Sequence, residues 1–204
     1  MISLTREQTY LLNKILDNGI KEAVGTFNKM LESSISIKKM SIVIFDQDKP
    51  GETLTDLNGK EFASILISFS GTISGSSVLT FSLESASKLV VALTDEDPGS
   101  DGFEEVMADT LYEVGNIIIS GILVYIANLL ATRLEHSVPE YIKGKIPGLL
   151  KQFVPENEMV FLLKRTTFEI QTPQIDGLIF IVLEQDSLEP LITAMVKYEV
   201  RENL

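Results

Sequence analysis

Two passages of the sequence, at residues 73–89 and 175–191, follow the same order of residue types. Each begins with Ile-x-Gly, continues as an apolar, strand-like run, and then has an acidic or hydroxyl-bearing cap before an amphipathic helical pattern. A local order that occurs twice in one chain predicts a duplicated structural unit. The strands of the two copies most simply join in one sheet.

The remaining periodicity supplies the other elements of this unit. A capping box at Thr5 and Gln8 opens the first helix, and Ser82 caps the helix that follows the first hairpin. The predicted elements are helices at 5–31, 83–93, 103–133 and near 146–153, strands at 35–45, 62–69, 75–81, 159–170 and 178–184, an extended piece at 136–141, and a closing helix from 187. The sequence therefore predicts an α+β fold with α/β-type layers. It is an internally duplicated helix–three strands–helix unit, with one largely antiparallel six-stranded sheet packed against two long helices.

The best internal boundary is the stretch at residues 94–102. It is polar and acidic, and it contains Pro98 and Gly99, which interrupt helices and strands. We expect a single domain over residues 1–204, made of two pseudo-repeats at about 1–95 and 101–204.

The composition excludes several classes of function. Acidic residues outnumber basic ones by 29 to 17, which gives a net charge of −12, so nucleic acid is not an expected partner. The chain has no cysteine and one histidine, His136, which excludes thiol chemistry, thiolate metal sites and histidine-clustered metal sites. With 45% hydrophobic residues, a chain of this length can bury a sizeable core.

The sequence shows no signal for export or membrane insertion. Its first residues lack an apolar stretch behind a basic start. The most apolar run, at 117–131, is interrupted by Ser120, Gly121 and Asn128 and is shorter than the ~20 apolar residues that a membrane span needs. We expect this run to be a buried core helix in a soluble, cytoplasmic protein.

Three polar side chains, Asp109, Glu113 and Asn116, lie on the otherwise apolar helix predicted at 103–133. Their spacings of four and three place them within an arc of roughly 60°, at ~100° per residue. Such a group is either the solvated face of an amphipathic helix or a functional site. Gly115 and Gly121 favour the functional interpretation, because each glycine costs about 1 kcal/mol of helix stability relative to alanine.

The pattern Asp109-x3-Glu113-x2-Asn116-x22-Pro139 resembles the signature of the CheC/CheX-type phosphatases of bacterial chemotaxis, a family with flagellar-switch relatives. The strand-to-helix passage from Phe81 onward resembles this family too, and so does the duplicated architecture. The resemblance implies a hydrolase that removes the phosphoryl group from the aspartyl-phosphate of a CheY-like response regulator in two-component signalling.

The resemblance also implies a role for each signature residue. Asn116 would position the attacking water through its amide oxygen or nitrogen, and Glu113 would pair with a lysine of the regulator. Asp109 would be a supporting or capping group, and Pro139 would be structural, since proline stops a helix. The magnesium ion would belong to the regulator, so the chain is expected to need no cofactor or metal of its own.

The first helix of the chain lacks this signature. Alignment with the family by sequence places Tyr10, Lys14 and Asp17 at its three positions, and none of these has the expected residue type. We therefore expect one functional site, in the second half. Gly19 and Gly25 of the first helix are expected at packing contacts with another helix.

Two functions of different classes fit these features. The first is the phosphatase, and the second is a non-catalytic module that binds a response regulator or acts as a flagellar-switch-like adaptor. The partner in both is a phosphorylated CheY-like regulator, the deamidase CheD is a further candidate, and a monomer and a homodimer both stay open. The phosphatase prediction fails if the side chains of Glu113 and Asn116 point into the core.

Overall fold

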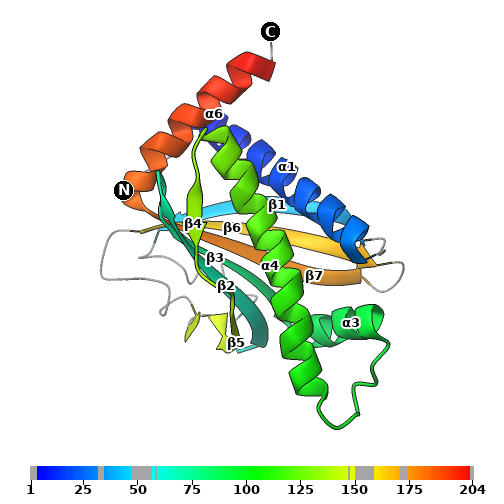
Figure 1. Cartoon of the computed structure of the whole chain (residues 1–204). Coiled ribbons are helices and arrows are strands. Elements are labelled where there is room, and N and C mark those ends of the chain that lie inside the picture. The colour runs from blue at the N-terminus through cyan, green and yellow to red at the C-terminus, as the bar shows by residue number, and fades with distance from the viewer. Residues whose placement is uncertain are drawn as a thin grey trace.

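The computed structural model describes residues 4–31, 35–46, 57, 59–146, 148–149, 159–170 and 174–202. Helices and strands alternate in an order close to the predicted one (Figure 1). The elements are α1 (Arg6–Leu31), β1 (Ile35–Asp46), β2 (Glu61–Gly71), β3 (Gly75–Ser82), α3 (Leu83–Thr94), α4 (Phe103–Leu129), β4 (Leu134–His136), β5 (Glu140–Lys145), β6 (Met159–Ile170), β7 (Gln174–Glu184), a 3-10 turn (Gln185–Ser187) and α6 (Leu188–Glu202).

The described strands form one seven-stranded sheet in the order β1-β6-β7-β3-β2-β4, and β5 also pairs with β2. Every pairing in it is antiparallel, so the predicted antiparallel α+β architecture is confirmed. The predicted count of six strands is wrong, because the extended piece expected at 136–141 forms the ends of two short strands. Phe69 pairs with His136 and Leu66 pairs with Glu140, so residues 137–139 bulge out between these pairs. Pro139 has no N–H to donate to a strand ladder, which explains the break.

The two long helices, α1 and α4, cross the same face of the sheet (Figure 1). The core lies between them and this face. Helix α4 has the length and hydropathy of a membrane span, with a mean hydropathy of 1.6 over its most apolar window, and half of that window is buried. Its buried residues follow helical spacing and join the same apolar cluster as those of α1 and the strands, so α4 is the core helix of this fold.

The opposite face of the sheet has a smaller apolar cluster. Phe62, Leu66 and Phe180 point to this side and are buried there with Ile146 and Leu149. A brief helix is predicted near 146–153, and most of that range lies outside the described residues. The described part shows that the chain after β5 covers this face of the sheet.

The predicted helix caps are present. At the start of α1, the Gln8 amide donates to Thr5 Oγ1 over 3.1 Å and the Thr5 amide donates to Gln8 Oε1 over 2.8 Å, which is the predicted capping box. At the start of α3, Ser82 Oγ accepts from the Ser85 amide over 3.1 Å. These signals are local, so they could be predicted without knowledge of the tertiary structure.

Helix α4 ends at Leu129, four residues before the predicted end at 133. The reason is a left-handed residue, Ala131, with φ of 50°. The amide of the next residue, Thr132, donates to the Ala127 carbonyl over 3.0 Å, which is the closing bond of a Schellman motif.

Contacts in the two halves are related by one shift in residue number. A shift of 102 takes Gly19 to Gly121 and Ala23 to Tyr125, and it interchanges the two α1–α4 contacts, Ala23 with Gly121 and Gly19 with Tyr125. The same shift interchanges two pairs of the β3–β7 ladder, residues 75 with 183 and 81 with 177. This relation is the one expected of a duplicated unit. The duplication and the single-domain division into residues 1–95 and 101–204 stay predictions.

Candidate functional site

The polar triplet of α4 lies on the side of the helix that faces away from the sheet. Asp109 and Glu113 are exposed and Asn116 is half-buried, whereas Val114 and Gly115 between them are buried. The side chains of Glu113 and Asn116 therefore do not point into the core. The structure thus passes the test that would have excluded the phosphatase prediction.

Gly115 fixes the distance between this turn of α4 and the sheet. A Cβ atom at this position would lie 2.5 Å from Ile65 Cβ on β2, closer than real atoms approach. Gly121 has a similar place at the crossing with α1, where a Cβ would lie 2.6 Å from Ala23 Cβ. Both glycines are therefore required by packing, so the argument that they indicate function is wrong. Gly115 allows the backbone of the Glu113–Asn116 turn to lie close against β2.

The first and third members of the triplet differ in what they contact. Asn116 Oδ1 accepts a hydrogen bond from Ser120 Oγ over 3.2 Å, one turn further along α4. Asp109 makes no hydrogen bond or ion pair within the part of the chain that the structure describes. It does not cap the helix either, because α4 begins at Phe103 and its N-cap is Gly102.

Pro139 lies in the loop between β4 and β5 and is half-buried. The loop is tied to β2 at Ser137, whose amide donates to the Ser68 carbonyl over 2.9 Å and whose Oγ accepts from the Ser68 amide over 3.1 Å. Both β4 and β5 contact α4, so this edge of the sheet lies beside the helix that bears the triplet. This placement agrees with a structural role for Pro139.

An ion pair joins the same edge to the start of α4. Lys143 of β5 lies 2.8 Å from Glu104 Oε1, and this hydrogen bond raises the pKa of the lysine. The pair is exposed, so it contributes little to the free energy of folding. It helps to fix β5 beside the first turns of α4. Among the described residues, no group of three His, Asp or Glu side chains could hold a metal ion.

The counterpart of the triplet on α1 is different in kind. Shifted back by 102, the three positions fall on Glu7, Leu11 and Lys14, a different register from the one that alignment by sequence predicted. Leu11 is 2% exposed and belongs to the core. Lys14 Nζ lies 5.9 Å from the ring centre of Tyr198 on α6. In either register α1 has no Glu–Asn pair.

Helix α6 contacts α1, and α3 contacts α4, but the two short helices differ in length. The shift of 102 would place the end of α3, Thr94, at residue 196, but α6 continues to Glu202. The additional turns contain Tyr198, whose ring packs over Lys14. The two long helices differ in exposure at one of the three positions, where Glu113 of α4 is exposed and its counterpart Leu11 of α1 is buried.

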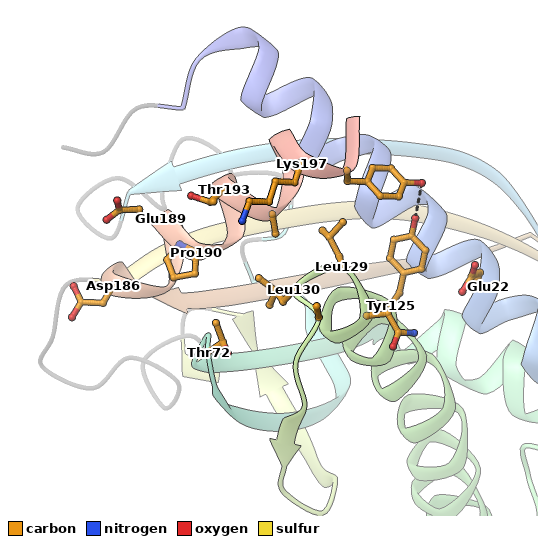
Figure 2. A pocket seen from close by; sticks show the side chains of 14 residues that line it. Glu22, Thr72, Tyr125, Leu129, Leu130, Asp186, Glu189, Pro190, Thr193 and Lys197 are labelled. Atoms are coloured by element: carbon orange, nitrogen blue, oxygen red, sulfur yellow. Dashed lines mark hydrogen bonds between the residues drawn. The ribbon is translucent and has the colours of Figure 1, made fainter. Parts of the chain in front are cut away.

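A groove of about 770 Å³ lies between the end of α4, α6 and α1 (Figure 2). At its inner end Tyr125 Oη donates to Tyr198 Oη over 3.3 Å and accepts from Asn18 Nδ2 over 3.4 Å. Glu22 and Lys197 stand at its rim. The groove contains none of the signature residues, so the candidate site is the exposed face of α4.

The pKa of Tyr125 is raised by its surroundings at the inner end of this groove. Burial first, and then donation to Tyr198, raise its pKa from 10.0 to about 12. The folded state thus keeps a proton that the unfolded state loses, so this stabilisation is complete below pH 10 and is lost as the pH rises towards 12. A tyrosinate absorbance titration of Tyr125→Phe should lack a late step, near pH 12, that the wild-type protein shows. An unchanged late step in Tyr125→Phe would contradict the assignment.

The described fold, with one antiparallel sheet and two long helices on the same face, is similar to those of several solved structures. The structure of Thermotoga maritima FliY matches 96% of this chain and 99% of its own, with 18% identity and a TM-score of 0.72. A chain of the FliM–SpeE complex from H. pylori matches 96% of this chain and 97% of its own, with 13% identity and a TM-score of 0.66. A chain of the CheX–CheY–BeF3–Mg complex from Borrelia burgdorferi matches 84% of this chain and 98% of its own, with 20% identity and a TM-score of 0.52.

A family model matches the middle of the chain. Residues 63–151 match the model of the chemotaxis phosphatase CheX. This range contains all four signature residues, from Asp109 to Pro139. The predicted resemblance to the CheC/CheX-type chemotaxis phosphatases is thereby confirmed. No protein among the curated ones matches significantly.

Sequence reasoning missed one residue of this face, Ser120. From the sequence, Ser120 is recognised only as a polar residue that interrupts the apolar run at 117–131. Its spacing of four from Asn116 would have placed it on the same face of the helix, and this spacing was the signal that could have found it.

Proposed function

We propose that this protein is a phosphatase that hydrolyses the aspartyl-phosphate of a CheY-like response regulator. The observation that carries the proposal is the exposed Glu113–Asn116 turn on a helix whose other faces are buried. The family match over residues 63–151 supports the reaction class. The similarity to a chain of the CheX–CheY–BeF3–Mg complex supports the class of partner.

In the proposed reaction Asn116 positions the attacking water. The water oxygen forms a bond to phosphorus, the bond from phosphorus to the aspartyl carboxylate oxygen breaks, and the products are inorganic phosphate and the free aspartate of the regulator. One proton of the water stays on the oxygen that becomes part of the phosphate, and the other passes to a second phosphate oxygen or to solvent. An amide suits this position because it orients water without adding a negative charge beside the phosphoryl group. The metal ion of the reaction is proposed to belong to the regulator.

Glu113 is proposed to anchor the regulator through an ion pair with a lysine. Its carboxylate is exposed and lies on the same face of α4 as Asn116, so both groups can reach one partner surface. Asp109 is exposed two turns before Asn116 and is proposed to support the same contact. The chain itself has a net charge of −12, which favours approach by a basic surface.

Glu113→Ala should therefore weaken the complex more than the chemistry. We expect the Kd for a regulator loaded with beryllofluoride to rise roughly tenfold, because truncation leaves a charge of the partner unpaired at the interface. The decay rate at saturating regulator should change much less. Glu22→Ala removes an equally exposed carboxylate from α1 and serves as the control, with unchanged affinity expected. An equal Kd for Glu113→Ala and wild type would show that Glu113 is not the anchor.

The other parts of the proposal follow from the same site. The protein acts in the cytoplasm with one site per chain, needs no cofactor of its own, and does not bind nucleic acid. CheD is a further candidate partner, and both a monomer and a homodimer are compatible with one exposed α4 face.

A non-catalytic switch or adaptor module is the second candidate. The observation in its favour is that a chain of the FliM–SpeE complex matches 96% of this chain, against 84% for the CheX complex. The two candidates differ in one result. An adaptor would bind the phosphorylated regulator without shortening the lifetime of its phosphoryl group, whereas a phosphatase would shorten it.

A further inference from the structure

Ser120 lies one turn after Asn116 on α4, and its hydroxyl group donates to the amide oxygen of that residue. The Oγ–Oδ1 distance is 3.2 Å, and both side chains are half-buried. We infer that Ser120 is a positioning residue, which holds the Asn116 amide in the orientation that the reaction needs. The inference rests on the proposed phosphatase function.

The presence of a serine here is not explained by helix stability. Serine is less favourable than alanine inside a helix by up to about 0.5 kcal/mol, and the neighbouring positions are apolar. A serine within a helix usually turns its hydroxyl back to the carbonyl oxygen of residue i−4. Here the hydroxyl bonds to the side chain of residue i−4 instead, and that side chain is the one proposed to hold the water.

The hydrogen bond restricts the rotation of an otherwise adaptable group. An asparagine amide has oxygen on one side and nitrogen on the other, so a half-turn about its last torsion exchanges an acceptor for two donors. Donation from Ser120 keeps Oδ1 on the side facing the Ser120 hydroxyl, one turn further along α4, and leaves Nδ2 on the opposite side. The second lone pair of Oδ1 can still accept a hydrogen from water, so that the lone pair of the water remains available to attack phosphorus.

The expected effect is on the rate constant and not on binding. Losing one neutral hydrogen bond frees Asn116 to rotate, and we expect Ser120→Ala to lower kcat about three- to tenfold with KM for the phosphorylated regulator unchanged. Thermal stability should stay equal or rise slightly, because the half-buried hydroxyl leaves no large cavity and alanine favours the helix. A purely structural serine would leave kcat unchanged.

The test compares steady-state kinetics of four proteins: wild type, Ser120→Ala, Ser120→Thr and Ser87→Ala. Threonine retains the hydroxyl and should restore at least half of the wild-type kcat. Ser87→Ala is the same substitution at a half-buried position of another helix, α3, and should behave as wild type. Adding Ser120→Ala to Asn116→Ala should cause no further loss, because the two residues act as one unit.

Each failure has a separate meaning. If wild type does not accelerate phosphoryl loss at all, the proposed function is wrong. If wild type is active and Ser120→Ala has the same kcat, or if only its KM changes, the inference about Ser120 is overturned while the phosphatase function stands. If Ser120→Thr is as slow as Ser120→Ala, the hydroxyl is not the cause and the inference is again overturned.

Discussion

Replacing Asn116 with alanine is expected to bring regulator dephosphorylation close to its uncatalysed rate, a loss of about a hundredfold or more. The reason is that positioning the water is the main contribution that the exposed α4 face can make. The Asn116 side chain is half-buried, and Gly115 brings the backbone of this turn close to β2. If the amide is removed, we therefore expect no neighbouring side chain to take its position. The measurement is the decay of a phosphorylated CheY-like regulator in the presence of each variant.

The controls separate loss of chemistry from loss of fold. Alanine favours a helix more than asparagine does, so Asn116→Ala should unfold no earlier than wild type. Asn128→Ala makes the same change at an exposed position near the end of the same helix and should keep full activity. Asn116→Ala should also still bind the beryllofluoride-loaded regulator. Wild-type decay rates for Asn116→Ala would remove Asn116 from the mechanism.

Gly115→Ala is expected to destabilise the protein. The new Cβ would lie 2.5 Å from Ile65 Cβ and Cγ2, so α4 or β2 has to move. Overpacking of this kind costs about 1–3 kcal/mol, which exceeds the gain in helix propensity of up to about 1 kcal/mol. Because the displaced turn bears Glu113 and Asn116, activity should fall as well in the folded fraction.

Gly25→Ala is the matched control for this change. Gly25 also lies inside a long helix, α1, but a Cβ there would meet nothing within 4 Å. Only the helix-propensity term applies, so this variant should be more stable than wild type by about 0.5–1 kcal/mol. Urea unfolding of the three proteins measures both effects. If Gly115→Ala were as stable as Gly25→Ala, the close approach of α4 to β2 would be wrong.

The parts of the fold that sequence could predict are those determined locally. The capping box at Thr5 and Gln8, the cap at Ser82 and the hairpin of β2 and β3 each depend on neighbouring residues, and each is present. The parts that failed depend on distant partners. The edge strand expected at 136–141 divides because its two ends pair with different stretches of β2, and nothing near Pro139 in sequence shows that pairing.

The candidate site shows the same division. Helical spacing alone places Asp109, Glu113 and Asn116 on one face, but it cannot show whether that face is exposed, since exposure depends on where the sheet lies. Helical spacing also cannot predict the register of α1 against α4. This register is determined by the contacts of Gly19 and Gly121 where the two helices cross. It makes Lys14 the residue of α1 that is equivalent to Asn116 of α4. Gly25, predicted as a second packing site on α1, makes no such contact.

The most direct test of the proposed function is the lifetime of the phosphoryl group on a CheY-like regulator, measured with and without the wild-type protein. The regulator is phosphorylated with a small phosphodonor, the donor is removed, and phosphoryl loss is followed while binding is verified in parallel. We predict that the protein shortens this lifetime in proportion to its concentration. An unchanged lifetime, with binding of the phosphorylated regulator demonstrated, would contradict the phosphatase proposal and favour the adaptor.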